Sequence, residues 1–367
     1  MILQYWQKFK KLNYWLIFLI SLIASIGFAI LYSAADGRLM PWAGKQILRF
    51  MAGFVIMIAV AVTDIRRWMF LAYPFYIVSL ILLVGVELMG FIGMGARRWI
   101  DLYVIQIQPS ELMKIALILA LARYFHLTSL AETRKVSHLI FPLFLIIVPT
   151  LLMMRQPDLG TAMILIMSGT MLFFVTGVQI WKFVATGGLV AAAIPLLWTL
   201  LHDYQRKRVL IFLDPESDPS NAGYHVSQSK IALGSGGWFG KGYMGGSQSH
   251  LNFLPEKQTD FIFTMFSEEF GFIGGLILIL LYVLLLIYGF IVAIKARNHF
   301  GRLVAIGINS TFFLYAFINM AMVMGMVPVV GVPLPLVSYG GTALLTLMMG
   351  QGLLLSVALY QDVRIGR

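Results

Sequence analysis

The sequence contains no cysteine and few charged residues, and both absences restrict what the chain can be. Without cysteine there are no disulfides and no thiolate metal sites. Only 12% of the 367 residues are charged, whereas about 25% are charged in soluble domains. With 60% hydrophobic residues and a mean hydropathy of +0.86, a soluble fold would expose large apolar patches to water. The composition therefore predicts a membrane protein.

Long hydrophobic runs predict about ten transmembrane helices, because a helix needs about 20 mainly apolar residues to cross a bilayer. The first run is no signal peptide, since it lacks a small-residue cleavage site and further spans follow it. The predicted fold is all-α, a polytopic membrane protein that forms one domain over residues 1–367. The ten runs are Leu12–Ser33, Ile47–Val62, Phe70–Met89, Leu112–Phe125, His138–Met154, Leu159–Val178, Phe183–Leu201, Phe272–Ile294, Leu303–Met326 and Thr342–Leu359.

The distribution of basic residues predicts the orientation in the membrane. Ten spans put both termini on one side, and short cytoplasmic loops are enriched in Lys and Arg. The short segments on the side of the termini hold fourteen such residues, and those on the opposite side hold seven. We therefore expect both termini to be cytoplasmic. The net charge of +11 then reflects contact with anionic lipid rather than with nucleic acid.

The longest polar segment runs from His202 to Asp260, between the seventh and eighth predicted helices. Loops of this length tend to be functional or disordered, and its aromatic and aliphatic residues favour packing. Ser227–Leu233 has the pattern of a short helix or re-entrant segment. Seven of the thirteen residues from Gly234 to Gly246 are glycine, which fits either a flexible tip or an anion-binding backbone. No nucleotide-binding P-loop string is present.

This extracytoplasmic loop carries six basic and six acidic residues, so it is not a polybasic lipid anchor. Most of these charges are expected to pair with one another in water. A few bases could instead converge on a diphosphate, which Arg binds as a fork and Lys as a point charge. The first candidates are Arg206, Arg208, Lys230 and Lys241, followed by Lys114 and Arg98 outside the loop.

Asp260 stands where the loop meets the eighth hydrophobic run. Thr and Asp are preferred at helix N-caps, so one interpretation is a cap. The other interpretation is a carboxylate at the membrane–water boundary that acts as a general base. The two roles do not exclude each other.

Further charged residues lie near the fourth predicted span. Glu111 and Lys114 are one helical turn apart and would pair, since charge inside a membrane is costly. A role in function and a role in structural support both remain open for this pair. Arg98 precedes them in a short outer loop, where Trp99 is typical of an interfacial anchor.

The proline-rich stretch and the histidines bear on which chemistry is possible. Three prolines between Pro328 and Pro335 cannot continue a helix, and irregular backbone at membrane depth is tolerated where it lines a cavity. The six histidines have no metal-ligand spacing, and no Ser-His-Asp set can be argued. The sequence identifies no cofactor; a divalent cation would be compatible with diphosphate chemistry, but no ligand set for it is visible.

Several long strings, in this order along nearly the whole chain, resemble the SEDS family of bacterial shape, elongation, division and sporulation proteins. Within that family, the QSK run, the GSQS element and GVPLPLVSYGG are similar to the elongation branch, RodA. The strings are GARRWIDL (95–102), QPSELMK (108–114), QPDLGTA (156–162), DYQRKRV (203–209), FLDPESDP (212–219), AGYHVSQSKIALGSGG (222–237), GKGYMGGSQSHLNFLPEKQTDFIF (240–263) and VVGVPLPLVSYGG (329–341).

The resemblance implies a ten-helix fold in the bacterial inner membrane and polymerisation of lipid II into glycan strands during cell elongation. It also implies a class B penicillin-binding protein and the elongation machinery as partners. The essential acid of the family falls on Asp260. RodA-like chains often have His two residues before this acid, where the present sequence has Gln258, so an imidazole cannot assist there.

The resulting hypothesis is a peptidoglycan glycosyltransferase with Asp260 as base. Its predicted contacts with lipid II and the nascent strand also include Glu111, Lys114, Arg98, and Gln248 and Ser249 of the GSQS element. Two rival functions remain, a lipid II flippase and a noncatalytic scaffold for the penicillin-binding protein. Transporters of the first kind often contain inverted repeats, and none is visible here.

Overall fold

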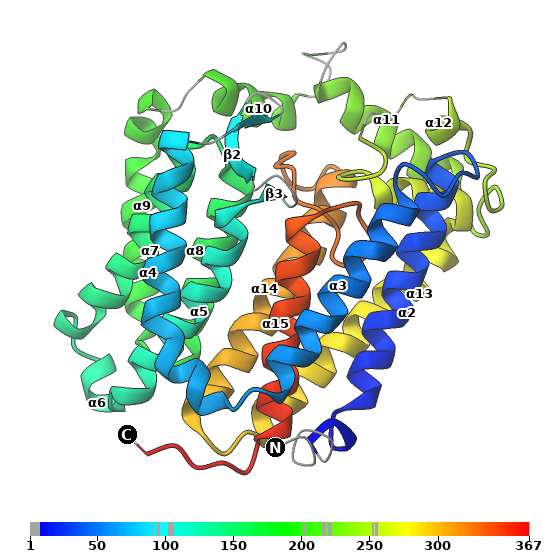
Figure 1. The fold of residues 1–367 in the computed structure, drawn as a ribbon. Helices are drawn as coiled ribbons and strands as arrows, with labels where there is room; N and C mark the ends of the chain where they lie inside the picture. The colour runs from blue at the N-terminus through cyan, green and yellow to red at the C-terminus, as the bar shows by residue number, and fades with distance from the viewer. Residues whose placement is uncertain are drawn as a thin grey trace.

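A computed structural model of the chain describes residues 8–89, 91–93, 96–101, 106–200, 203–214, 218, 222–251, 253 and 256–366. It is a bundle of long helices, which confirms the predicted all-α membrane fold (Figure 1). Each of the ten hydrophobic runs corresponds to one helix. These are α2 (Tyr14–Ala34), α3 (Ala43–Val62), α4 (Ile65–Met89), α5 (Pro109–Leu127), α7 (Ser137–Arg155), α8 (Leu159–Val175), α9 (Ile180–Leu200), α13 (Ile262–Lys295), α14 (His299–Val323) and α15 (Thr342–Leu359).

Within the described part of the chain, seven helices are long and apolar enough to cross a membrane. The apolar helices α8 and α9 also cross the bundle, and α5 carries Glu111, Lys114 and Arg123 among its apolar residues. At the centre stands α14, with 83% of its most apolar window buried, whereas α4 has only 28% of its window buried. The exposed faces of the outer helices are rich in Leu, Ile, Val and Phe, as lipid contact requires.

The ends of the bundle differ in structure. α2 begins and α15 ends at the same end, where the short helix α6 (Leu130–Thr133) also lies (Figure 1). The opposite end carries α10 (Asp203–Leu213), α11 (Ala222–Ser235) and α12 (Ser247–His250). α11 confirms the helix expected around Ser227–Leu233. The long loop thus contains three helices, and its charges gather at the end far from the termini.

A small antiparallel sheet, which the sequence did not predict, lies at the same end as α10. It consists of β1 (Phe91–Gly93), β2 (Ala96–Asp101) and β3 (Gln106–Ile107) in the order β1-β2-β3. The sequence predicts a loop with an interfacial Trp in this segment. Its strands of two to six residues are too short for hydrophobic alternation to reveal them.

α13 starts ten residues earlier than predicted because it continues past a kink at Gly271. This glycine has φ 68° and ψ −166°, which a residue with a side chain adopts only under strain. The kink frees backbone groups, and the glycine-rich segment binds them. The amides of Lys241 and Gly242 donate to the carbonyls of Glu268 and Glu269 (both 3.0 Å), and the amide of Phe272 donates to the carbonyl of Gly237 (2.9 Å).

The proline-rich segment between α14 and α15, residues 324–341, enters the bundle instead of crossing its surface. Val332, Leu334, Leu336 and Val337 are almost fully buried. α8 lets the segment approach through Gly160, where a Cβ atom would lie 2.6 Å from the carbonyl oxygen of Val330. Buried irregular backbone of this kind needs hydrogen-bond partners, and these lie around Asp260.

Candidate active site

Asp260 lies immediately before α13, at the end of the bundle that carries α10 and α11. The N-cap of α13 is Phe261, and no side chain caps the helix. The prediction that Asp260 is the cap was therefore wrong, because its carboxylate does not bind the first amides of the helix. The side chain is half-buried.

Hydrogen bonds to three consecutive carbonyl groups hold the backbone at Asp260 in place. The amide of Tyr339 donates to Gln258 O (2.8 Å), the hydroxyl of Ser338 donates to Thr259 O (2.6 Å), and Asn319 Nδ2 donates to Asp260 O (2.9 Å). Two of these donors belong to the proline-rich segment and the third to α14. The acid is thus positioned by residues 59 or more positions away in the sequence.

The surroundings of Asp260 favour its protonated form more than water does. Burial, and secondly the charge of Glu256, raise the pKa of Asp260 to about 6, while the charges of Arg208 and Arg98 act in the opposite direction. A carboxyl group with this pKa is ionised at neutral pH and still basic enough to accept a proton. These are the properties of a general base that works near pH 7.

Arg98, from β2, is one of two predicted diphosphate-binding residues whose charge acts on Asp260. Its guanidinium donates to the carbonyls of Gln156 (3.2 Å) and Pro157, and lies 4.0 Å from Asp158. Asp158 itself is the N-cap of α8 and accepts from the amide of Thr161. The QPDLGTA string therefore positions Arg98 through main-chain contacts.

Arg208 is the second, and it lines a small pocket together with Lys230. The pocket lies between α10, α11 and the first turn of the proline-rich segment, at Val327–Val329. This agrees with the expectation that the proline-rich segment lines a cavity. Arg208 and Lys230 are thus brought together although 22 residues separate them.

Two other residues that were predicted to bind the diphosphate instead bind groups of the protein itself. Arg206 donates to the carbonyls of Trp198 (2.9 Å) and Thr199 (2.7 Å) near the end of α9. Lys241 forms an ion pair with Glu268, which is fully buried, at 2.7 Å. Both side chains therefore hold helices in place here, and the structure does not group them with Arg208 and Lys230.

The GSQS element is fixed by the same buried acid. Glu268 accepts from the amide of Gln248 (2.8 Å) and from the hydroxyl of Ser247 (3.4 Å). The side chain of Ser249 lies outside the described residues. The glycine-rich segment before it packs on the kink of α13, and the amides of Gly237, Gly240, Lys241 and Gly242 donate to carbonyls of the protein itself.

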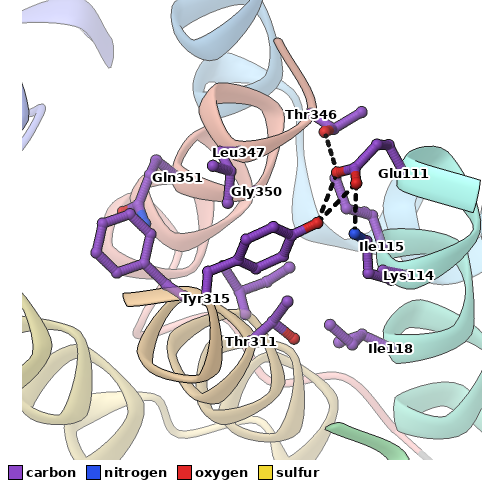
Figure 2. Close-up of a pocket in the computed structure, with 12 residues that line it drawn as sticks. Glu111, Lys114, Ile115, Ile118, Thr311, Tyr315, Thr346, Leu347, Gly350 and Gln351 are labelled. Atoms are coloured by element: carbon purple, nitrogen blue, oxygen red, sulfur yellow. Dashed lines mark hydrogen bonds and ion pairs between the residues drawn. The ribbon is translucent and has the colours of Figure 1, made fainter. Parts of the chain in front are cut away.

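Glu111 and Lys114 form the predicted pair deep in the bundle (Figure 2). Lys114 Nζ donates to Glu111 Oε1 (2.7 Å) and lies 4.3 Å from the centre of the Tyr315 ring. The hydroxyl of Tyr315 bridges both carboxylate oxygens (2.7 and 2.8 Å), and Thr346 donates to Oε2 (3.2 Å). The carboxylate of Glu111 thus links α5, α14 and α15.

The sequence analysis did not identify the buried polar residues that support the backbone around Asp260. Asn319 and Gln46 are fully buried polar residues, and Gln46 Nε2 donates to Ser338 O (2.8 Å). A polar amide inside an apolar run was the available signal, because such a group needs a partner. Among the described residues, no group of three or more His, Asp or Glu side chains could hold a metal ion.

A family model for FtsW, RodA and SpoVE, described as cell cycle proteins, matches residues 10–362. The peptidoglycan glycosyltransferase MrdB of Escherichia coli K12 is 45% identical over 361 residues, which cover 98% of this chain and 96% of MrdB. MrdB of Helicobacter pylori is 35% identical over 98% of this chain and 92% of its own length. The similarity therefore extends over nearly the whole of each protein.

Solved structures agree with the sequence matches. A chain from a peptidoglycan synthase complex, described as coordinating polymerization and crosslinking, superimposes with a TM-score of 0.82 at 32% identity, covering 96% of this chain and 99% of that chain. The rod shape determining protein RodA of Thermus thermophilus gives a TM-score of 0.72 at 30% identity, covering 95% and 97%. The chain belongs to the FtsW/RodA/SpoVE family of cell cycle proteins.

Proposed function

We propose that the protein is a peptidoglycan glycosyltransferase that polymerises lipid II, with Asp260 as its general base. The observation that carries the proposal is the half-buried Asp260 carboxylate, with its raised pKa and two neighbouring arginines, in a membrane protein of this family. The relatives named peptidoglycan glycosyltransferases support the reaction class.

In the proposed reaction, the 4-hydroxyl of one lipid-linked disaccharide attacks the anomeric carbon of a second. The new glycosidic C–O bond forms as the bond from that carbon to the undecaprenyl diphosphate breaks, and the diphosphate leaves with the electron pair. The hydroxyl proton passes to the Asp260 carboxylate. Such general-base assistance is typically worth about 10²–10⁴-fold in rate.

Charge that develops on the diphosphate needs cations nearby. Arg208 and Lys230 line one pocket, and the charges of Arg208 and Arg98 reach Asp260, so these three are the proposed diphosphate contacts. Arg206 and Lys241 are proposed as structural instead, because each is held by helix α9 or α13. A divalent cation could share the charge, but we assign it no ligands.

Polymerisation by Asp260 predicts a pH dependence. Because only the ionised carboxylate accepts a proton, kcat/KM is expected to fall about tenfold per pH unit below the pKa of Asp260, which is about 6. Initial rates of glycan formation from pH 4.5 to 8 would measure this acid limb.

Glu256→Gln provides the matched variant for this measurement. Glu256 raises the pKa of Asp260 by its negative charge, so its neutralisation should move the acid limb to lower pH. The amide oxygen of Gln can still accept from the Thr259 hydroxyl, as Glu256 does now (3.1 Å). An acid limb that stays in place in Glu256→Gln would show that another group controls the profile.

The reaction class is tested most simply in detergent. The purified protein, alone or with a class B penicillin-binding protein, is expected to convert labelled lipid II into long glycan strands on a gel. A flippase would form no polymer and needs two compartments, which micelles lack. A scaffold would leave lipid II unchanged as well, so the absence of polymer in both mixtures contradicts the proposal.

The setting of the enzyme is part of the proposal. The matched peptidoglycan synthase complex supports a penicillin-binding protein as partner in cell elongation. The two-to-one excess of basic residues supports cytoplasmic termini in the bacterial inner membrane. The site would then face the outer side, where the sugars of lipid II are polymerised, and the chain would work as a single membrane domain.

A further inference from the structure

α14 carries two polar side chains one turn apart that reach different parts of the protein. Tyr315 donates to the carboxylate of Glu111, in the middle of the bundle. Asn319, four residues later, points from the same face of the helix toward the proposed active site. Both side chains are almost fully buried, so neither bond competes with water.

The amide group of Asn319 uses both of its hydrogens. Nδ2 donates to Asp260 O (2.9 Å) and to Val332 O (2.7 Å), which joins the start of α13 to the proline-rich segment. The other two bonds to this stretch come from Ser338 and Tyr339, within the proline-rich segment itself. Asn319 therefore ties Asp260 to α14, a second membrane-spanning helix beside α13, and a helix is a more rigid support than a loop.

The position of Asn319 along the bundle depends on how α14 packs against its neighbouring helices. Glu111 on α5 accepts from Lys114, from Tyr315 on α14 and from Thr346 on α15, so three helices meet at one buried carboxylate (Figure 2). A shift of α14 along its axis would break the Tyr315 bond and move Asn319 by the same distance. Misplacing a reacting group by about 1 Å can cost about 10²-fold in rate.

We propose that Asn319 is a positioning residue for Asp260, and that the Glu111–Lys114 pair fixes its position through Tyr315. The pair then acts on catalysis without touching substrate. The inference rests on the proposed role of Asp260 and deepens it, since it identifies what keeps the base in place.

Asn319→Leu tests the proposal, because Leu has nearly the same volume and no donor. The expected result is a fall in kcat of about tenfold or more, a KM for lipid II within about threefold of the wild type, and a displaced acid limb, since Asp260 moves relative to Glu256, Arg98 and Arg208. Asn309→Leu is the matched control. Asn309 is also buried on α14 and donates to a carbonyl, Leu286 O (2.9 Å), far from Asp260.

Asn309→Leu should reduce thermal stability while kcat and the acid limb remain unchanged. If Asn319→Leu behaves in the same way, Asn319 is merely structural and the proposal fails. Tyr315→Phe, which removes a single oxygen, keeps the test decisive should Asn319→Leu not fold. It is expected to lower kcat and displace the acid limb, and unchanged values would overturn the coupling to Glu111.

The double variant tests the coupling directly. If Tyr315 acts through Asn319, adding Tyr315→Phe to Asn319→Leu should lower kcat only slightly more than Asn319→Leu alone does. If the two residues act independently, the fold-reductions in kcat of the two single variants should multiply. The failure of this proposal is distinguishable from that of the proposed function. If Asp260→Asn is active, Asp260 is not the base and the proposed function fails. If Asp260→Asn is inactive and Asn319→Leu is fully active, only the positioning role of Asn319 fails.

Discussion

Asp260→Asn is expected to lower the kcat of glycan polymerisation by about 10²–10⁴-fold, which is the usual contribution of a general base. Asn has the shape of Asp and leaves the backbone carbonyls of residues 258–260 with their three donors. It cannot accept the hydroxyl proton at neutral pH. The measurement is the initial rate of polymer formation from labelled lipid II by the purified variant, with lipid II binding measured in parallel and expected within a few fold of the wild type.

Asp64→Asn is the matched control for this substitution. Asp64 lies at the end of the bundle that carries the termini, where it accepts from the amide of Arg66 (2.9 Å), a bond that Asn can also make. Its replacement should leave polymerisation unchanged. If Asp260→Asn instead retains more than about a tenth of the wild-type kcat, the side chain is not the general base, and another group must accept the hydroxyl proton.

The helices of this protein are predictable from the sequence because lipid imposes a strong local requirement. A spanning helix must satisfy every backbone group internally and present about 20 apolar side chains, and both features lie within one continuous segment. Even α5 was found despite Lys114 and Arg123, since Ile115–Ala122 between them is a run of eight apolar residues. The start of α13 was misplaced because a kink at Gly271, stabilised by the distant segment 237–242, has no local signature.

The candidate site was predictable only in part, because its geometry depends on contacts between distant segments. Asp260 was found as an acid at a membrane boundary and by resemblance to a family. Its donors Asn319 and Ser338 lie on other elements, and Gln46, which supports Ser338, is 292 residues away from it. Spacing along a chain contains no information about such pairs.

The basic residues illustrate the same limit. Arg206 and Arg208 are two positions apart, yet one binds carbonyls of α9 and the other lines the pocket with Lys230. Lys241 resembles any loop lysine in the sequence, and its pairing with the fully buried Glu268 depends on the kink in α13. The positive charge of a residue predicts only that it could bind a diphosphate. The fold then separates the residues that line the pocket from those that bind to a neighbouring helix.

The largest expected effect on stability comes from breaking the buried ion pair. Lys114→Met leaves the Glu111 carboxylate without its cation in the middle of the bundle, and removing one partner of a buried pair typically costs about 3–5 kcal/mol. Thermal or denaturant unfolding in detergent would measure the loss. The exposed pair of Arg297 and Asp362 (3.3 Å; side chains 61% and 74% exposed) is the control, and Arg297→Met should cost less than about 1 kcal/mol.

The double variant Glu111→Gln/Lys114→Met decides whether the cost arises from an unpaired charge. It removes both charges, and the amide of Gln can still accept from Tyr315 and Thr346, so most of the stability lost in Lys114→Met should return. If the double variant is less stable than Lys114→Met, then the carboxylate itself, as the common acceptor of α5, α14 and α15, stabilises the bundle more than its charge destabilises it. In that case the pair would be required for the packing of α14, and the positioning of Asn319 would depend on the negative charge of Glu111 rather than on neutral hydrogen bonds.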